Sequence, residues 1–380
     1  MFRLDFLLPP KKEVLIFDRV GSEVIFNILP KKTKVEILDL RYEKINFLVI
    51  ILSLLNLFKL KEMYIINYIK YVSPKLVITY IDNNPLFYQL KKKFKNIKFV
   101  CIQNARRDKP FLDSLNHNHP KLDYLFCISD SYKKIYSSKL QAKIKTIGTI
   151  KNNLVVNKKS NKKGILFVSE HTSSKVTQNL IGWNYCKHPT QQIKKLEEKK
   201  IYGDDYWNLP QEKVIQLIDK FCKEKKIKFT ILQKPNNNKI EKNYYYLLKK
   251  KYNLNCNFVS GKSFDQSYKI CDKYQVVVTL HSTLGYENVA RGNKNFFVPI
   301  RDNFFNTKIQ SFFYPLKNFM KCIYWLDKLN DKNFFYKLEK IYKMKNETYK
   351  KLIQKTNFNF LMSYDKDNKT IKKTILNLLK

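Results

Sequence analysis

Short apolar runs recur along this chain, and most of them are followed by a segment with the residue pattern of a helix. Runs of this length, bounded by polar or turn-forming residues, are typical of buried strands. Strands that alternate with helices form parallel βαβ units. The sequence therefore predicts an α/β protein with Rossmann-like, doubly wound sheets. The runs lie at 14–18, 34–40, 75–81, 98–104, 124–129 and 143–150, and then at 164–170, 228–235, 257–260, 276–279 and 293–300.

A polar segment at 157–163, NKKSNKK, separates the two sets of runs and contains no apolar residue. At 380 residues, the chain is long enough for two domains that each bury a core. We therefore predict an N-terminal domain over 1–156, a linker over 157–163, a C-terminal domain over 164–330 and a helical tail over 331–380.

The chain is strongly basic, with a formal net charge of +41 that comes mostly from lysine. Such a charge attracts nucleic acid, anionic membrane surfaces or anionic substrates. The many Lys, Asn, Ile and Tyr residues also fit an AT-rich genome, and the sequence lacks recognition-helix, zinc-finger, RRM and KH signatures. We therefore predict no nucleic-acid partner, while an anionic membrane surface stays open as a partner.

The seven cysteines are widely spaced and form no C-x-x-C pair, so they indicate neither a disulfide framework nor a zinc site. This usage fits a reducing cytosol, and the N-terminus lacks the pattern of a signal peptide. His117 and His119 have no cysteine or carboxylate cluster beside them, so no metal site is predicted.

The longest apolar run, Phe47 to Leu55, is too short to span a bilayer. We expect it to form a buried helix. A helix that lies on a membrane surface is the alternative.

The stretch 276–294 carries the clearest signal of a binding site. A run of three valines leads into Ser282 and Thr283, which are good N-cap residues, so a helix is expected to begin at the carboxyl end of a strand. Ligands collect at this edge of open α/β sheets, and helix N-termini bind anions. We predict that both hydroxyls contact a diphosphate. Gly285 would let the ligand approach the backbone, and Glu287 would accept the ribose hydroxyls. The alternative is that Ser282 only caps the helix and that Glu287 is solvated.

The chain combines two predicted doubly wound domains with an E-x-x-A-x-G pattern near the end of the second sheet, which here runs from Glu287 to Gly292. In both features it resembles glycosyltransferases of the GT-B fold. More narrowly, the chain resembles bacterial O-antigen biosynthesis proteins over about residues 10 to 300, because several short motifs occur in that family's order. These motifs are IDNN at 81–84, IQN with Arg106 at 102–106, GTIKNN at 148–153, YWNLP at 206–210 and HSTLGYENVARGNK at 281–294.

The resemblance implies two domains that face a cleft, in a glycosyltransferase of surface polysaccharide (O-antigen or capsule) biosynthesis. Its substrates would be a nucleotide-sugar donor and a lipid-linked or saccharide acceptor. The enzyme would be cytoplasmic, with a peripheral position at the inner face of the cytoplasmic membrane as an alternative. GT-B enzymes usually stabilise the leaving diphosphate with helix dipoles and basic side chains, so no metal and no cofactor are expected.

The resemblance also implies a donor site in the second domain. Lys234 would add positive charge at the phosphates, and Lys234-Pro235 stands where Kdo and sialic acid transferases commonly have His-Pro. This difference weakens a CMP-sugar donor and leaves UDP, GDP and dTDP sugars open. The expected donor-binding residues are Lys234, His281, Ser282, Thr283, Gly285 and Glu287.

Transfer with inversion needs a general base that deprotonates the acceptor hydroxyl. We expect this base in the first domain, where Asp18 ends the first strand, Glu23 begins the next helix and Asp82 follows a later strand. The alternative role of Glu23 is to compensate the helix dipole.

Further polar residues end neighbouring strands and are expected to face the cleft. Arg106 would hold a phosphate, or with its neighbours would only cap a loop. His171 would steady the diphosphate or transfer a proton, although a lone histidine often does neither. The residues are Asn83, Asn84, Gln103, Asn104, Arg106, Glu170 and His171.

Three other functions are compatible with the same phosphate site. A nucleotide-sugar epimerase and a polyol-phosphate transferase are the enzymatic alternatives. A non-catalytic assembly protein that binds carbohydrate or membrane is the third.

Overall fold

The computed structural model of this chain divides into two compact units. The first contains Met1–Arg106, Phe111–Leu154 and Ser363–Lys380, and the second contains Arg107–Pro110 and Val155–Met362. The structure describes residues 3–39, 44–54, 59–107, 111–112, 115, 120–155, 162–172, 200–201, 203–235, 239–261, 263, 265–307 and 321–380.

The first unit is built on a six-stranded parallel sheet with the strand order β3-β2-β5-β6-β7-β8. The central strands β2 (VLIF) and β5 (LVIT) are buried along their whole length, as expected for a sheet that is covered on both faces. The order reverses between β2 and β5, so their carboxyl ends form a switch point where such sheets bind ligands. The strands are β2 (Val14–Phe17), β3 (Val35–Leu38), β5 (Leu76–Thr79), β6 (Lys98–Ile102), β7 (Lys121–Cys127) and β8 (Gln141–Thr146).

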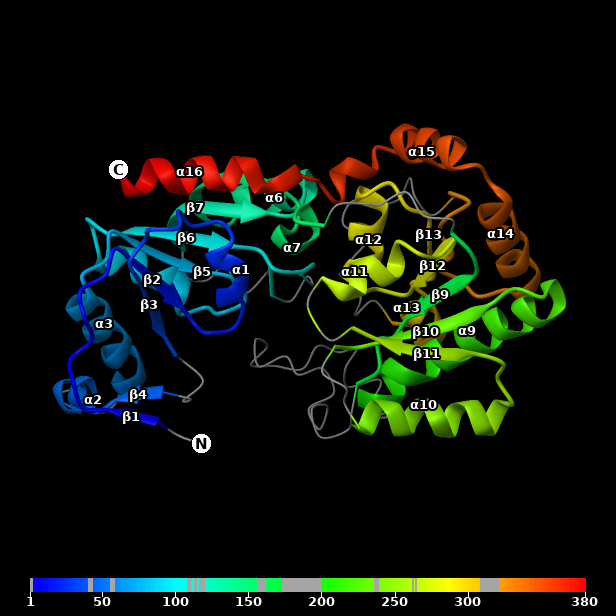
Figure 1. The fold of residues 1–380 in the computed structure, drawn as a ribbon, viewed down its shortest axis with the longest axis horizontal. Helices are drawn as coiled ribbons and strands as arrows, with labels where there is room; N and C mark the ends of the chain where they lie inside the picture. The colour runs from blue at the N-terminus through cyan, green and yellow to red at the C-terminus, as the bar shows by residue number, and fades with distance from the viewer. Residues whose placement is uncertain are drawn as a thin grey trace. The chain divides into compact units, whose positions relative to one another are not determined.

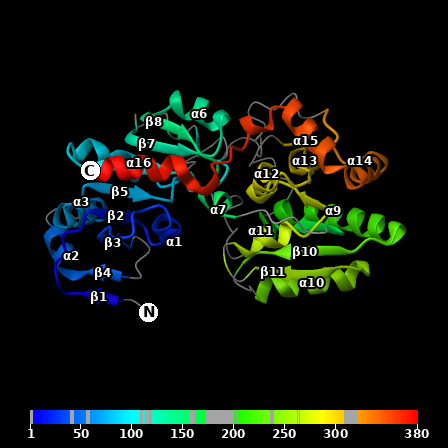
Figure 2. The same ribbon diagram turned by 45° about the horizontal axis from the view of Figure 1, so that its top comes forward.

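The C-terminal helix α16 covers one face of this sheet together with α1, and Figures 1 and 2 show it running alongside the strands. Ile371 and Ile375 are fully buried there in one cluster with Ile16. Neighbouring strand residues point to opposite faces, so Phe17 packs on the other side, 5.0 Å from the ring of Phe87 in α4. The helices are α1 (Ser22–Phe26), α3 (Leu60–Val72), α4 (Phe87–Leu90), α6 (Asp130–Ser137), α7 (Ile150–Asn153) and α16 (Lys369–Leu379).

The second unit has a five-stranded parallel sheet in the order β11-β10-β9-β12-β13. Its switch point lies between β9 and β12. Cys271 of α11 and Leu284 of α12 pack on Leu166 and Val277 of the sheet. The strands are β9 (Ile165–Val168), β10 (Phe229–Gln233), β11 (Asn257–Ser260), β12 (Val276–Thr279) and β13 (Asn295–Phe297), and the helices are α9 (Gly203–Lys225), α10 (Lys239–Tyr252), α11 (Gln266–Cys271), α12 (Thr283–Ala290), α13 (Arg301–Phe305), α14 (Asp331–Lys343) and α15 (Asn346–Lys355). The predicted pair of doubly wound α/β domains is therefore confirmed.

The helical tail expected over 331–380 is divided between the two units. In the second unit, Phe334 of α14 packs 5.4 Å from the ring of Phe296, and the Tyr349 hydroxyl of α15 donates to the Asn295 carbonyl at 2.9 Å. The last helix, α16, instead completes the core of the first unit. Of the expected linker, 157–161 lies outside the described residues, and Lys162 and Lys163 belong to the second unit.

The run expected to form a buried helix is only partly buried. Strand β4 (Lys44–Asn46) pairs in parallel with β1 (Arg3–Asp5), and the Asn46 side chain then caps α2 (Phe47–Ser53) by accepting the Val49 N–H at 3.0 Å. Within α2 only Val49 and Ser53 are buried. In the described part of the chain, no helix combines the length and apolar character that crossing a bilayer requires.

Candidate functional site

A pocket of about 440 Å³ lies in the second unit, over the carboxyl ends of β9, β10 and β12. This is the switch point of the sheet, where ligands of doubly wound proteins bind. Of the predicted donor residues, Lys234, His281, Ser282 and Thr283 line it. The full lining is Val168, Ser169, Glu170, Thr172, Trp207, Leu232, Gln233, Lys234, Pro235, Ser267, His281, Ser282, Thr283 and Leu284.

The Glu170 carboxylate occupies the N-terminus of α12. Its Oε1 accepts the backbone N–H groups of His281 and Ser282, both at 2.5 Å, and its Oε2 accepts the Arg301 guanidinium at 2.6 Å. A negative charge is favourable there because the first N–H groups of a helix lack partners within the helix and the dipole is positive at that end. Glu170, expected on the acceptor side, therefore sits among the residues expected to bind the donor.

Arg301 begins α13 and is fully buried. Its guanidinium carbon lies 4.4 Å from the centre of the Trp207 ring, and it also donates to the Trp207 carbonyl at 3.3 Å and to His281 Nδ1 at 2.7 Å. Because a guanidinium only donates, Nδ1 of His281 must accept, and the ring proton then sits on Nε2. Arg301 was not among the residues predicted from the sequence. The available signal was a basic residue just beyond the carboxyl end of the last strand.

His171 is held by the YWNLP motif. Its Nδ1 lies 3.1 Å from Asn208 Oδ1, which also accepts the Gln211 Nε2–H at 2.8 Å. An amide oxygen only accepts, so His171 carries its proton on Nδ1. The ring stacks on Tyr244 at a centroid distance of 4.1 Å. His171 thus packs beside the pocket, whereas its neighbour Thr172 lines it.

Lys234 follows β10, and its ammonium group donates to the carbonyl of His171. Its backbone N–H donates to the buried carboxylate of Glu241 at 3.1 Å. Desolvation lowers the pKa of the Lys234 ammonium, although Glu241 and Glu170 oppose this shift. Burial likewise raises the pKa of Glu241. Lys234 as a whole is exposed, and its ammonium lines the pocket, where its positive charge favours an anionic ligand.

The first turn of α12 combines capping with tight packing. Ser282 is the N-cap, and its Oγ accepts the Leu284 N–H at 3.3 Å. A Cβ at Gly285 would lie 2.4 Å from Thr279 Oγ1, so a glycine is needed where the helix crosses β12. This packing requirement differs from the expected role in ligand approach.

Glu287 is buried one turn further along α12 and accepts the Tyr268 hydroxyl at 3.0 Å. It shares a helix face with Thr283, because residues four apart in a helix are neighbours. Among the described residues, neither Gly285 nor Glu287 belongs to the pocket lining.

The last part of the 281–294 motif forms a buried polar network. Arg291 pairs with Asp272 at 2.9 Å, and the Asn293 side chain donates to Asp272 at 2.6 Å and to Asn288 at 2.9 Å. Gly292 has a φ of 86°, a conformation that favours glycine. These residues fix the end of α12 and take no part in the pocket.

In the first unit, Asp18, Asp82 and Asn104 follow the adjacent strands β2, β5 and β6. Asp18 has a φ of 86°, which is rare outside glycine and often found at functional sites, and its Oδ1 accepts the Val20 N–H at 3.0 Å. Asp82 is fully buried, and its Oδ1 accepts the Asn104 N–H at 3.2 Å. The structure therefore brings Asp82 and Asn104 together, with contacts that hold the two loops.

The other residues predicted on the acceptor side differ in exposure. Glu23 is exposed on α1 and lies 3.8 Å from the Lys151 ammonium. The Asn84 side chain closes a turn by accepting the Leu86 N–H at 3.1 Å. Gln103 is buried, and its side chain donates to the carbonyl of Ala105 and accepts the N–H of Ile128. These contacts correspond to the alternative in which the residue only caps a loop. Asn83 and Arg106 are half-buried.

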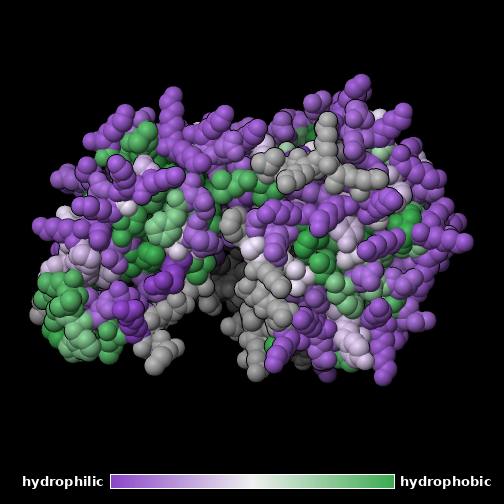
Figure 3. All heavy atoms as spheres, in the orientation of Figure 1, coloured by the Kyte–Doolittle hydropathy of each residue, from purple (hydrophilic) through white to green (hydrophobic). Residues whose placement is uncertain are grey.

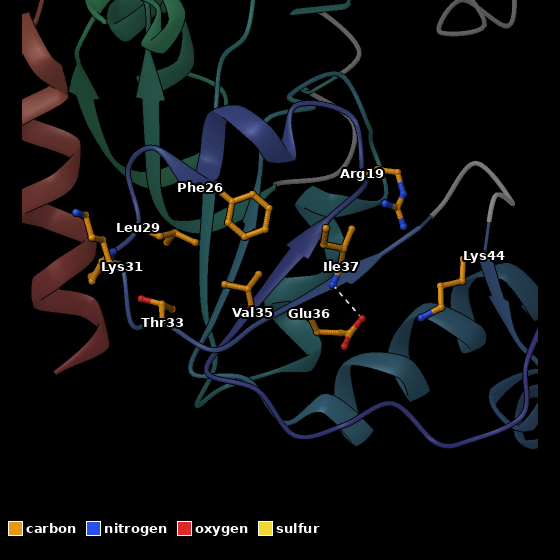
Figure 4. Close-up of a pocket in the computed structure, with 10 residues that line it drawn as sticks. Arg19, Phe26, Leu29, Lys31, Thr33, Val35, Glu36, Ile37 and Lys44 are labelled. Atoms are coloured by element: carbon orange, nitrogen blue, oxygen red, sulfur yellow. Dashed lines mark hydrogen bonds between the residues drawn. The ribbon is translucent and has the colours of Figure 1, made fainter. Parts of the chain in front are cut away.

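A second pocket, of about 470 Å³, lies along β3 of the first unit (Figure 4). Three of the four charged side chains that line it, those of Arg19, Glu36 and Lys44, are engaged within the protein. Arg19 pairs with Asp39 at 2.8 Å, Lys44 pairs with Asp5 at 2.5 Å, and Glu36 accepts the Ile37 N–H at 3.1 Å. None of the predicted site residues lines it. The pocket over β9, β10 and β12 is therefore the stronger candidate.

Within the described residues, no group of three or more His, Cys, Asp or Glu side chains is arranged to hold a metal ion. His117 and His119 lie outside the described part of the chain.

The family model described as "putative O-antigen biosynthesis protein" matches residues 100–379. No curated protein matches the chain in sequence. The solved structure of the wall teichoic acid polymerase TagF, a variant with CDPG, is similar with a TM-score of 0.56 and 11% identity, over 97% of this chain and 89% of TagF.

A second similar structure is the "putative UDP-N-acetylglucosamine 2-epimerase" from Listeria monocytogenes. It has a TM-score of 0.53 and 8% identity, over 96% of this chain and 95% of that chain. At these identities the likeness concerns the fold, which is that of the GT-B class with two Rossmann-like domains.

Proposed function

This chain belongs to the family of O-antigen biosynthesis proteins, and we propose that it is a glycosyltransferase. It moves a sugar from a nucleotide-sugar donor to a lipid-linked or saccharide acceptor at the inner face of the cytoplasmic membrane. The observation that carries the proposal is the switch-point pocket of the second unit, where Lys234 and the start of α12 meet.

The donor diphosphate binds beside Lys234 and the hydroxyls of Ser282 and Thr283. Glu170 already accepts the N–H groups of His281 and Ser282, just before α12, and Arg301 balances its charge. The ammonium of Lys234 is then the lysine charge of the pocket lining that contacts a phosphate. Glu287 accepts the ribose hydroxyls from the same helix face as Thr283.

In the reaction, a carboxylate takes the proton of the acceptor hydroxyl, whose oxygen attacks the anomeric carbon of the sugar from the face opposite the leaving group. The bond between that carbon and the phosphate oxygen breaks, and the nucleoside diphosphate leaves with inversion. Lys234 and the hydroxyls of Ser282 and Thr283 stabilise its charge without a metal ion or cofactor. Asp18, Glu23 and Asp82 are the proposed bases, of which Asp18 and Asp82 are buried and Glu23 is exposed. Asp18 and Glu23 are tested first, because the Asp82 carboxylate also holds the Asn104 loop. Asn83, Asn84 and Arg106 are proposed to contact the acceptor.

A transferase of polyol phosphate is the second candidate, favoured by the similarity to the wall teichoic acid polymerase TagF. The two reactions break different bonds. Sugar transfer breaks a carbon–oxygen bond and releases a nucleoside diphosphate, whereas polyol-phosphate transfer breaks the diphosphate and releases a nucleoside monophosphate. An epimerase would convert the nucleotide sugar without any acceptor.

The first experiment screens nucleoside diphosphates and nucleotide sugars for thermal stabilisation of the full chain, because a ligand of the folded state raises its melting temperature. The best ligand is then supplied with a lipid-linked or saccharide acceptor, and the released nucleotide is identified by chromatography. We expect acceptor-dependent release of a nucleoside diphosphate. Monophosphate release would support the polyol-phosphate reaction. Conversion without acceptor would support the epimerase, and calorimetry without nucleotide binding would support a non-catalytic assembly protein.

The base is tested with Asp18→Asn and Glu23→Gln. One of the two substitutions should lower turnover by about 100-fold or more, because general bases contribute that much. Donor affinity should stay unchanged. Full turnover in both variants would remove both residues from the mechanism.

A further inference from the structure

Helix α2 turns apolar side chains toward solvent. Its sequence, FLVIILS, contains no charged residue, and only Val49 and Ser53 are buried. Phe47, Ile51 and the C-cap residue Leu54 are 41%, 45% and 45% exposed, at the spacing of one helix face. The outer face of a helix in a soluble protein is normally polar. This outer face is apolar throughout.

A neighbouring segment extends the apolar surface. Phe6, Leu7 and Leu8, which follow β1, are 62%, 83% and 44% exposed. The Phe6 ring lies 5.5 Å from that of Phe47, so the two segments form one patch. Figure 3 shows it as a hydrophobic area over α2 and β1 at the lower left. We call it the α2 patch; its members are Leu4, Phe6, Leu7, Leu8, Phe47, Ile51, Leu52 and Leu54. Contiguous exposed patches of this kind mark sites of interaction.

The charges next to the α2 patch are those that attract an anionic surface. Arg3, Lys11, Lys59 and Lys61 adjoin it in sequence and are exposed. Nearby acids are paired with lysines: Asp5 with Lys44 at 2.5 Å, and Glu62 with Lys93 at 3.1 Å. The chain as a whole carries a charge of +41. Aromatic and aliphatic side chains flanked by cations are the composition of elements that lie in the headgroup region of anionic bilayers.

We propose that the α2 patch is the surface by which this protein docks on an anionic phospholipid bilayer. Helix α2 lies in the plane of the interface and inserts Phe47, Ile51 and Leu54, and the segment after β1 inserts Phe6 and Leu7. Lysines around the patch contact the lipid phosphates. The inference adds a docking surface to the proposed function, and its test needs neither donor nor acceptor.

The test is cosedimentation of the full chain with vesicles of phosphatidylglycerol and phosphatidylethanolamine, compared with vesicles of phosphatidylcholine. Wild type should bind the anionic vesicles more strongly, and salt should weaken this binding without abolishing it. Ile51→Glu should lower the partition coefficient by about tenfold or more, because an inserted aliphatic side chain is lost. Leu7→Glu should act in the same way, and the double variant should not bind measurably.

The matched control is Leu247→Glu on α10 of the second unit. Leu247 is 54% exposed, and the substitution changes the net charge by the same amount as Ile51→Glu. It should bind vesicles like wild type. Unchanged melting curves would show that all variants fold.

Equal binding by Ile51→Glu and Leu247→Glu, or no binding by wild type, would overturn the proposal. So would a wild-type dimer in the absence of vesicles that Ile51→Glu dissociates, because a second copy of the chain would then be the partner. Transfer to a soluble saccharide acceptor should survive in Ile51→Glu, so failure of docking and failure of the transferase proposal are distinguishable.

Discussion

Glu170, a half-buried carboxylate, contacts different residues from those that its place in the sequence predicted. From its place after β9 it was expected to face the acceptor, yet it bonds the start of α12 and the guanidinium of Arg301. The two residues are 131 positions apart, and their pairing depends on how β9, β12 and α13 meet in space. Residue roles at strand ends therefore follow from the neighbours that the sheet provides.

The lowered pKa of Lys234 leads to a prediction for donor binding. The folded-state pKa lies below the usual lysine value, so the ammonium loses its proton, and with it the attraction for phosphate, at a lower pH than an exposed lysine. Nucleoside diphosphate affinity should fall as pH rises from neutral toward about 10, by about tenfold or more. Lys234→Arg should flatten this dependence because arginine stays charged. Calorimetric titrations over this pH range provide the measurement. An equal pH dependence of affinity in wild type and Lys234→Arg would show that the phosphates do not contact residue 234.

Glu287 leads to a second prediction, because substitutions can distinguish its proposed contact with the ribose from its hydrogen bond with Tyr268. Glu287→Ala should weaken a nucleoside diphosphate by about tenfold or more, the loss expected for charge-assisted hydrogen bonds. A 2′,3′-dideoxy analogue should bind wild type and variant alike. Tyr268→Phe is the structural control, and should cost about 1 kcal/mol of unfolding free energy while leaving affinity intact. A variant that loses stability but keeps its affinity would make Glu287 structural.

At the scale of elements, α12 contains two functions in one short helix. Its first residues line the pocket, while Asn288 and Arg291, near its end, join the network around Asp272. Gly285 stands between these parts and fixes the distance of the helix from β12. The motif at 281–294 therefore consists of a binding end and an anchoring end.

Replacing Gly285 tests this packing. In Gly285→Ala the new methyl group would overlap Thr279, which should cost about 1–3 kcal/mol of unfolding free energy even after the better helix propensity of alanine. In a Thr279→Ala background the same substitution should cost less, because both contacting Thr279 side-chain atoms are gone and only Asn295 Nδ2, at 3.1 Å from the new Cβ, stays close. Urea unfolding of wild type, the two single variants and the double variant measures the coupling free energy between positions 285 and 279. Additive effects would show that Gly285 does not meet Thr279.

At the scale of the whole molecule, the chain returns at its end to the unit in which it began. Helix α16 supplies Ile371 and Ile375 to the core of the first unit, although the preceding helices α14 and α15 belong to the second. The folding of the first unit therefore depends on residues that follow the second unit in the sequence.

This dependence predicts an effect confined to one unit. Ile371→Ala should cost about 2–5 kcal/mol, the usual range for a buried isoleucine. Amide exchange should accelerate in β2 and β5 of the first unit while β9 and β12 keep their protection. Leu376→Ala, at a 47% exposed position of the same helix, should change stability by about 0.5 kcal/mol or less. Equal acceleration in both units would contradict the separate cores.

The sequence by itself determined the types of the main elements, the two parallel sheets and the edge at which the pocket of the second unit lies. These follow from local patterns, because a run such as VVVT suits only a covered strand and a Ser-Thr pair suits a helix start. Ser282 and Thr283 could be placed at the pocket for this reason, whereas Lys234 was placed there by the resemblance to GT-B glycosyltransferases.

Only the tertiary structure decided which distant surfaces meet. It brought Arg301 to Glu170 and α16 to the first sheet, and it left the outer face of α2 open. An apolar run has the same periodicity whether another element covers it or not, so the pattern at Phe47 to Leu55 predicted burial where the structure shows an exposed face. Periodicity specifies which side of an element is apolar, and packing alone decides what that side contacts.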